Sequence, residues 1–376
     1  MSETNETMKA SVARAHLELA LKVVKPAINK KALLPVLQSV RVEQLPAGLA
    51  IDATDMEIAI RALIPESCGP QKPVLIPAEK LSAWTQLLDS EEVRITIESS
   101  HCRLQCGKAR AAMPIYNAVA WPDNITFSIE DEGATLPQDV LARALRFAMI
   151  TISQDESKYT LRAIKVESCN GKLLFIATDG HRMLVYTTQS DEQLDLLLPA
   201  DFVSALLPLL DGGNDALDIT HNAKEIIASI PGDMPVFLKT KKLSGQFPNW
   251  KAVLPSGHRT EIKVNAETLL VAVERSVLLS PAESHTVALN FGEQIEIEAA
   301  DPQHGQSNEW VECEGSVKPS QRVGINADYL IKFLRKLKGE IVISLSNTPS
   351  SNLLFKATPE DTESIEYVVC PVRLEK

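Results

Sequence analysis

Short apolar runs separated by polar turns recur along the chain, and residues 173–186 show this pattern in its simplest form. The apolar run 173–176 (Leu-Leu-Phe-Ile) precedes the polar segment 177–182 (Ala-Thr-Asp-Gly-His-Arg), and a second apolar run follows at 183–186 (Met-Leu-Val-Tyr). Two apolar runs around a turn that contains Asp and Gly predict a pair of antiparallel strands. Residues 93–97, 225–230 and 341–345 alternate with a period of two, which predicts further half-buried strands.

Three features recur in the same order at a spacing of roughly 125 residues, so the chain contains an internal repeat. An acid occupies the turn after a strand, at Asp55, Asp179 and Asp301. A later helix begins near residues 77, 199 and 326, with Pro or Asn at its start and an acid just inside. An earlier helix carries apolar residues at helical spacing: Leu17, Leu21 and Val24; Val140, Ala144 and Phe147; Leu269, Val273 and Val277.

The repeat predicts an α+β fold of three tandem modules, each with two helices packed on an antiparallel sheet. Pro208 is expected to shorten or kink the later helix of the second module. Polar and turn residues cluster at 131–133 and 255–258, so we expect a disordered leader at 1–7 and domains at 8–131, 132–256 and 257–376. The leader has no apolar centre, and no apolar stretch is as long as a bilayer requires, which predicts a cytoplasmic protein.

The formal net charge of −11 argues against a chain that coats DNA with its whole surface. Basic residues gather instead on the polar faces of the expected helices and in their loops. If all helices face one way, one surface is basic and suits sequence-independent contact with phosphates. Ordinary solvated helix faces are the alternative, and the helix after Ala200 has no basic residue before Asp211. The basic residues are Arg14, Lys22, Lys25, Lys30, Lys31, Arg143, Arg146, Lys158, Arg162, Arg275, Lys332, Arg335, Lys336 and Lys338.

Six cysteines are scattered along the chain. Cys102 and Cys106 lie four residues apart in an expected strand, so both side chains lie on one face of it. A zinc site would need a second pair of ligands nearby, and the sequence offers none there. We therefore interpret these cysteines as packed free thiols, and we expect no metal and no cofactor.

Four motifs carry a resemblance to a known family. They are 177–182; 247–250 (Phe-Pro-Asn-Trp) leading to 253–255 (Val-Leu-Pro); the tail 367–374 (Tyr-Val-Val-Cys-Pro-Val-Arg-Leu); and 34–37 (Leu-Pro-Val-Leu). With the threefold repeat, they make the chain resemble the beta subunits of bacterial DNA polymerase III, the beta sliding clamps. The resemblance implies three tandem DNA-clamp domains that form half of a closed ring. Two subunits would join head to tail as a homodimer, with helices lining the hole and sheets outside.

The resemblance also implies a function. Such a ring encircles double-stranded DNA without sequence specificity, tethers the replicative polymerase and so confers processivity, and it is not an enzyme. Its implied partners are the DNA polymerase III alpha subunit, the clamp loader delta subunit and other proteins with clamp-binding peptides. These peptides would enter an apolar cleft formed by Leu161, Thr178, Gly180, His181, Arg182, Met183, Pro248, Val253, Val368, Pro371, Val372 and Arg373. Arg182 and Arg373 are expected to act as polar anchors at the rim of this cleft.

By the same resemblance, the DNA contacts would come from Lys31 in one loop and from Gln154, Lys158 and Tyr159 in a second loop. The first domain of one subunit would meet the third domain of the other, with Leu278 and Leu279 in the apolar part of that interface. Three positions depart from the family pattern. Cys370 replaces a common methionine, Ala252 a frequent basic residue, and Trp250 the usual tyrosine.

Two other functions remain open at the level of residues. Asp179 and His181 could serve a hydrolase, although no nucleophile elbow, P-loop or metal-binding helix motif accompanies them. The acid recurs in all three turns whereas the histidine occurs once, which favours an acid that accepts backbone hydrogen bonds. A monomeric peptide-binding scaffold is the other alternative. A mass near twice 41.2 kDa and retention on circular DNA would distinguish a clamp from both.

Overall fold

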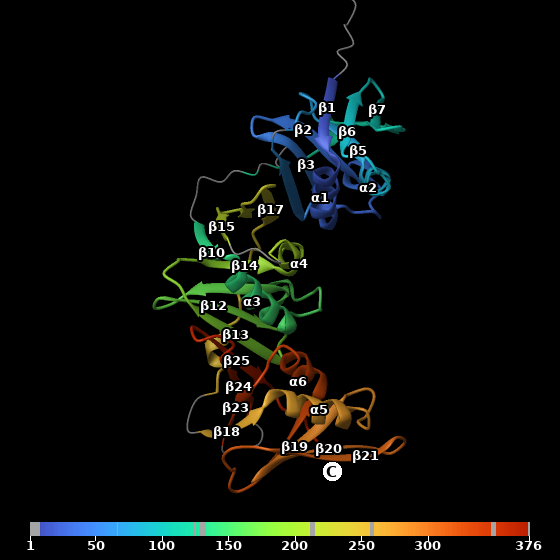
Figure 1. Ribbon diagram of the computed structural model, residues 1–376. Helices are drawn as coiled ribbons and strands as arrows, with labels where there is room; N and C mark the ends of the chain where they lie inside the picture. Colours follow the sequence, from blue (N-terminus) through green and yellow to red (C-terminus); the bar gives the residue numbers. More distant parts are fainter. Residues whose placement is uncertain are drawn as a thin grey trace, which may run out of the picture. The chain divides into compact units, whose positions relative to one another are not determined.

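One order of elements occurs three times in the chain: strand, helix, three strands, strand, helix, three strands (Figure 1). The computed structural model describes residues 8–65, 67–122, 125, 127, 133–210, 215–255, 259–346 and 351–374. The expected leader and both expected domain boundaries, at 131–132 and 256–257, lie outside the described residues. We call the three repeats the first, second and third modules.

The first module contains the long elements β1 (Met8–Ala13), α1 (Arg14–Val24), β2 (Ser39–Leu45), β3 (Gly48–Thr54), β4 (Ile58–Ile64), β5 (Val74–Pro77), α2 (Ala78–Gln86), β6 (Glu92–Ile97), β7 (His101–Cys106) and β8 (Ala109–Pro114). Its short elements are the 3-10 helices η1 (Lys25–Ala27), η2 (Pro35–Gln38) and η3 (Ala118–Ala120) and the strand β9 (Tyr116–Asn117).

The second module contains β10 (Gly133–Pro137), α3 (Gln138–Ala148), β11 (Ala163–Ser168), β12 (Lys172–Thr178), β13 (Arg182–Gln189), β14 (Asp195–Pro199), α4 (Ala200–Leu206), β15 (Ala216–His221), β16 (Glu225–Ile230) and β17 (Val236–Lys241). Its 3-10 helices are η4 (Met149–Thr151), η5 (Tyr159–Arg162) and η6 (Leu207–Leu209), and η7 (Trp250–Ala252) follows it. The third module contains β18 (Arg259–Asn265), α5 (Ala266–Val277), β19 (Thr286–Phe291), β20 (Gln294–Asp301), β21 (Gly305–Glu312), β22 (Gln321–Asn326), α6 (Ala327–Leu334), β23 (Glu340–Ser346), β24 (Leu353–Ala357) and β25 (Glu363–Val369).

The strands of each module form two antiparallel groups of four, with β9 added to one group in the first module, where the sequence predicted a single sheet. Each helix is preceded by one lone strand and followed by a group of three strands. The lone strand pairs with the first strand of the group that follows the other helix of the same module. In the first module, for example, β1 pairs with β6 and β5 pairs with β2. The two halves of each module are therefore interlocked, because neither half completes a sheet alone.

Two junctions between modules continue these sheets across module boundaries. Strand β17 of the second module pairs with β4 of the first, and β25 of the third pairs with β13 of the second. The strand orders of the joined sheets are β10-β15-β16-β17-β4-β3-β2-β5-β9 and β14-β11-β12-β13-β25-β24-β23-β18. The described residues consequently fall into two compact units that divide the second module between them: residues up to 139 with 201–242, and 140–200 with 243–374.

Local sequence explains why the helices begin, end and pack where they do. Helix α1 buries Leu17, Leu21 and Val24, which recur at helical spacing. The Asn326 side chain accepts hydrogen bonds from the N–H groups of residues 328 and 329 and so caps α6. Helix α4 ends at Leu206 and continues as η6, as expected from the following proline. Helices α1 and α2 pack together in the first module, and α5 and α6 in the third (Figure 1).

Cys102 and Cys106 are both buried on one face of β7 as free thiols. Burial raises the pKa of the Cys102 thiol to about 12, because an apolar environment disfavours the charged thiolate. Across the part of the chain that the structure describes, no group of metal-binding side chains occurs, and no helix could cross a bilayer.

Candidate functional site

The acidic turn has the same geometry in all three modules. The Asp179 carboxylate accepts hydrogen bonds from the N–H groups of His181 (2.9 Å) and Arg182 (3.0 Å). Asp55 accepts two such bonds at 2.9 and 2.8 Å, and Asp301 two at 2.8 and 2.9 Å. An acid of this kind holds a tight turn by satisfying backbone donors. The structural interpretation of the recurring acid is therefore confirmed.

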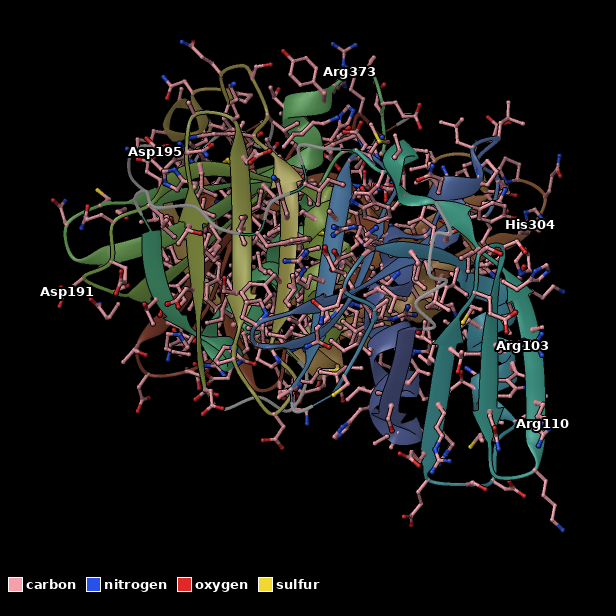
Figure 2. The ribbon with its side chains drawn as sticks, turned by 90° about the horizontal axis from the view of Figure 1, so that it is seen from above. Arg103, Arg110, Asp191, Asp195, His304 and Arg373 are labelled. Atoms are coloured by element: carbon pink, nitrogen blue, oxygen red, sulfur yellow. The ribbon has the colours of Figure 1, made fainter. Side chains whose placement is uncertain are left out.

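Arg182 is buried, whereas the sequence placed it as an anchor at the rim of a cleft. Its side chain is only 7% exposed, and its Nε donates to Asp179 Oδ2 at 2.9 Å. The guanidinium lies over the Tyr329 ring, 4.3 Å from the ring centroid. The rim assignment is wrong because Tyr329, far away in sequence, covers the arginine. Arg373, the other expected anchor, is exposed (Figure 2).

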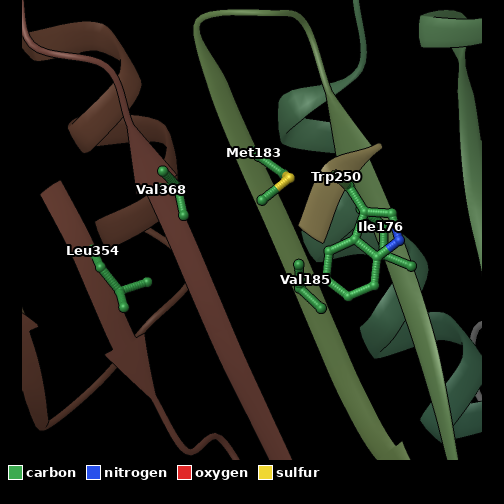
Figure 3. Packing of buried hydrophobic residues seen from close by; sticks show 6 residues of the cluster. All are labelled: Ile176, Met183, Val185, Trp250, Leu354 and Val368. Atoms are coloured by element: carbon green, nitrogen blue, oxygen red, sulfur yellow. The ribbon is translucent and has the colours of Figure 1, made fainter. Parts of the chain in front are cut away.

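Beside this turn lies a set of buried apolar side chains that we call the apolar cluster. Its members come from β12, β13, β24, β25 and η7, and Figure 3 shows them together. Met183 pairs with Val368 across the junction of β13 and β25. The cluster thus assembles at a junction between two modules. Its members are Ile176, Met183, Val185, Trp250, Leu354 and Val368, with Leu174, Phe247 and Leu254 packed against them.

Trp250 is held in the apolar cluster by Glu167 of β11. The indole Nε1 donates to Glu167 Oε2 at 3.3 Å, and Lys251 Nζ lies 2.9 Å from Oε1. Burial raises the pKa of Glu167, but the bonds from Lys251 and Trp250 outweigh it, and the net pKa is lowered. The carboxylate therefore stays charged and fixes the segment that crosses the cluster.

In the segment 247–254, the residues that the sequence predicts for the cleft differ in part from those that contact the apolar cluster. Pro248 and Val253 are exposed, whereas Phe247 and Leu254 pack against the apolar cluster. The helix η7 spans only residues 250–252, so Phe247 and Leu254 reach the apolar cluster from irregular segments on either side of it. The available signal was that Phe247, Trp250 and Leu254 are large apolar residues in an otherwise polar segment.

The C-terminal tail, residues 370–374, reaches the same place. Cys370 N–H donates to the His181 carbonyl, and Val372 N–H donates to the Gly324 carbonyl, both at 2.9 Å. Of the expected cleft residues, the turn and tail therefore bring together Thr178, Gly180, His181, Arg182, Met183, Val368, Pro371, Val372 and Arg373. Of the other three, Pro248 and Val253 lie in the exposed part of the segment described above, and Leu161 is half-buried in η5.

Asp179, His181 and Arg182 of the turn also line a cavity of about 560 Å³. Gln154 and Lys158, two of the expected DNA-binding residues, line it together with His181, Tyr329 and Lys332. Tyr159, the third residue of that loop, is 54% exposed. The structure therefore brings the second expected DNA loop close to the turn at Asp179.

Many cations expected on a basic surface are paired with acids. The pairs within 4 Å include Arg143–Glu363, Arg335–Glu274, Arg275–Glu309, Lys30–Glu79 and Lys158–Asp155. Burial, and next the charge of Arg146 in α3, lowers the pKa of Lys336, which follows α6. Lys31 is exposed. The basic surface is therefore weaker than the residue count suggested.

Comparison with known proteins gives one consistent result along the chain. Residues 8–126, 135–249 and 251–373 match the family models of the N-terminal, central and C-terminal domains of the DNA polymerase III beta subunit. The chain is 27% identical to the beta sliding clamp of Haemophilus influenzae and 27% identical to that of Escherichia coli. Each match covers 98% of this chain and 100% of the relative.

Solved structures show the same fold. The DNA polymerase sliding clamp of Pseudomonas aeruginosa matches with a TM-score of 0.89 at 23% identity. The sliding clamp of Bacillus subtilis matches with a TM-score of 0.90 at 21% identity. Both matches cover 98% of this chain and 100% of the solved chain.

Proposed function

Because the chain belongs to the DNA polymerase III beta subunit family, we propose that two copies close head to tail into a ring around duplex DNA. The chain is a DNA sliding clamp, a processivity factor without catalytic activity of its own. The hydrolase alternative is thereby excluded, and Asp179 already uses both carboxylate oxygens within its own turn.

The observation that best supports a homodimer is the strand pairing that is repeated at the junctions between modules. Each junction follows the same rule. The strand that ends the first three-strand group of one module pairs with the strand that ends the second three-strand group of the next module. These pairs are β4 with β17 and β13 with β25. Applied once more, this rule pairs β21 of the third module with β8 of a first module. Both β21 and β8 are edge strands of four-stranded sheets. A second copy supplies each missing partner.

Charge and apolar exposure on these two sheets support the same pairing. Arg94, Arg103 and Arg110 are exposed on β6, β7 and β8, and Figure 2 marks the last two. Glu296 and Glu298 lie on β20, beside β21, where Trp310 is 60% exposed. Arg94 and Arg103 pair with Glu92 and Glu98, and Glu298 pairs with Arg322, so Arg110 on the edge strand β8 and Glu296 next to β21 are the charges that support the pairing most directly. Opposite charges across an interface steer association and fix its register. Leu278, 76% exposed at the end of α5, supplies apolar surface in the third module, with the half-buried Leu279 beside it.

Partner peptides are proposed to bind between the turn, the tail and the segment at 247–254. The expected partners are the DNA polymerase III alpha subunit, the clamp loader delta subunit and other proteins with clamp-binding peptides. The apolar cluster provides a rigid base, while His181, Val253, Val372 and Arg373 remain exposed beside it. A base of packed apolar residues with few polar groups is typical of peptide-anchoring sites.

Sequence-independent DNA contacts are proposed for Lys31, Gln154, Lys158 and Tyr159, all of which are exposed. Weak phosphate contacts allow a ring to slide, because no base is read. The protein would work in the cytoplasm, where the replicated DNA lies.

Two measurements test this function. Light scattering should give a mass near twice 41.2 kDa. The protein, loaded on nicked circular DNA, should stay bound at high salt and be released when the DNA is linearised, because a closed ring is held topologically. A monomer, or equal retention on both forms of DNA, would refute the ring.

The peptide site has its own test. Deleting residues 371–376 should leave the mass unchanged and abolish binding to the polymerase III alpha subunit. Unchanged binding after this deletion would refute the peptide site and leave the ring untouched.

A further inference from the structure

We infer that Gly324 is a positioning residue for the partner-peptide site, because only a residue without a side chain lets the C-terminal tail dock on β22. This inference rests on the proposed peptide site. Gly324 is buried in the middle of β22 and is remote in sequence from every expected cleft residue. It acts through the tail rather than by contact with a partner.

The contacts around Gly324 are made by both edges of β22. One edge belongs to the four-stranded sheet, where Gly324 pairs with Ala288 of β19. The other edge receives the tail, since Val372 N–H donates to the Gly324 carbonyl at 2.9 Å in an antiparallel bridge. The tail therefore docks at the open edge of this sheet.

The close approach of the tail, and not the backbone conformation, demands glycine at this position. Gly324 does not adopt a left-handed φ, so an alanine could take its conformation without strain. A Cβ placed here would lie 2.5 Å from the Val372 carbonyl oxygen and 2.9 Å from two side-chain atoms of Leu374. A leucine side chain can rotate away, but a backbone oxygen cannot move unless the tail moves with it.

The tail is fixed at two points, and Gly324 controls one of them. The other is the hydrogen bond from Cys370 N–H to the His181 carbonyl at 2.9 Å. Pro371 lies between the two points, and Arg373 follows the second. Loss of the contact at Gly324 would free residues 371–373 while Val368 stays paired in β25. One wall of the peptide site would then lose its fixed position, although the apolar cluster remains.

The test compares Gly324→Ala with Gly292→Ala, a control in the same module. A Cβ at Gly292 meets nothing closer than the Gln294 carbonyl oxygen at 3.9 Å. The probe is the purified polymerase III alpha subunit of the same source, immobilised for surface plasmon resonance. Gly324→Ala should weaken binding about tenfold, while Gly292→Ala should change it less than about twofold. Carboxypeptidase should also remove the tail faster from Gly324→Ala.

Combining Gly324→Ala with deletion of residues 371–376 separates positioning from general damage. If Gly324 acts through the tail, the combined variant should match the deletion alone in dimer mass, thermal midpoint and residual binding, because coupled changes are not additive. A lower thermal midpoint in the combined variant would overturn the inference, since it would mean that β22 itself is damaged.

Two further results separate the inference from the proposed function. Full binding by Gly324→Ala, together with none by the deletion, would overturn the inference and leave the peptide site standing. Full binding by the deletion variant would overturn both.

Discussion

The junction between the second and third modules contains a buried carboxylate whose neutralisation should destabilise it measurably. The Glu363 side chain is 1% exposed. It accepts from Arg143 Nη2 at 2.8 Å and from the Tyr186 hydroxyl. Glu363→Gln keeps the shape but removes the charge that compensates Arg143. Breaking a buried ion pair costs about 3–5 kcal/mol, and we reduce this to about 2–3 kcal/mol because a 31% exposed arginine can rehydrate.

Thermal unfolding followed by calorimetry would measure this cost. For a cooperative unit of about 150–250 residues, 1 kcal/mol corresponds to about 2–4 °C, so the midpoint should fall by about 4–12 °C. Glu360→Gln is the matched control, because Glu360 is exposed in the adjacent turn. The control should leave the midpoint within about 1 °C. Equal midpoints for Glu363→Gln and Glu360→Gln would refute the reasoning, because the buried pair would then contribute nothing to the junction.

Three further predictions follow from other groups. Lys31→Ala combined with Lys158→Ala should shorten retention on circular DNA more than it weakens binding to the polymerase III alpha subunit; equal losses would contradict the proposed DNA contacts. Glu167→Ala removes the acceptor of the Trp250 indole and should weaken binding of the alpha subunit about fivefold, by titration, whereas unchanged affinity would exclude a role for this bond. The pKa of Cys102 rises from 9.0 to about 12 on folding, so above pH 9 the unfolded chain loses a proton that the folded chain keeps. The contribution of this thiol to the free energy of unfolding should therefore be constant below pH 9 and fall by up to about 1.4 kcal/mol per pH unit above it. Urea midpoints should fall less steeply above pH 9 in Cys102→Ala, and parallel slopes would argue against this thiol.

Local signals in the sequence predicted the features that depend on a few neighbouring residues. The acid of each turn bonds N–H groups two and three positions away, so Asp55, Asp179 and Asp301 could be interpreted without knowledge of the rest of the fold. The cap at Asn326 and the early end of α4 were likewise confirmed. The repeat itself was visible because three such local features recur together.

Features that depend on distant pairing were not visible in the sequence. Arg182 was placed at a rim because nothing near it indicates that Tyr329 stacks on it. The division of each module into two sheets escaped prediction, since the lone strand of one half pairs with strands from the other half. Gly324 carries no local signal either, because its neighbour is a tail that lies far along the chain.

The edges of β8 and β21, two unlike sheet edges of the same chain, have a consequence for assembly in general. Unlike edges associate head to tail, and such association ends only when the accumulated rotation completes a full circle. With three modules per copy, a ring of two copies contains six junctions, and it closes only if the turns at these junctions together complete a circle. A substitution that changes the turn at the β4–β17 or β13–β25 junction would therefore favour an open, growing filament over a closed dimer, even though the altered residue belongs to neither β8 nor β21.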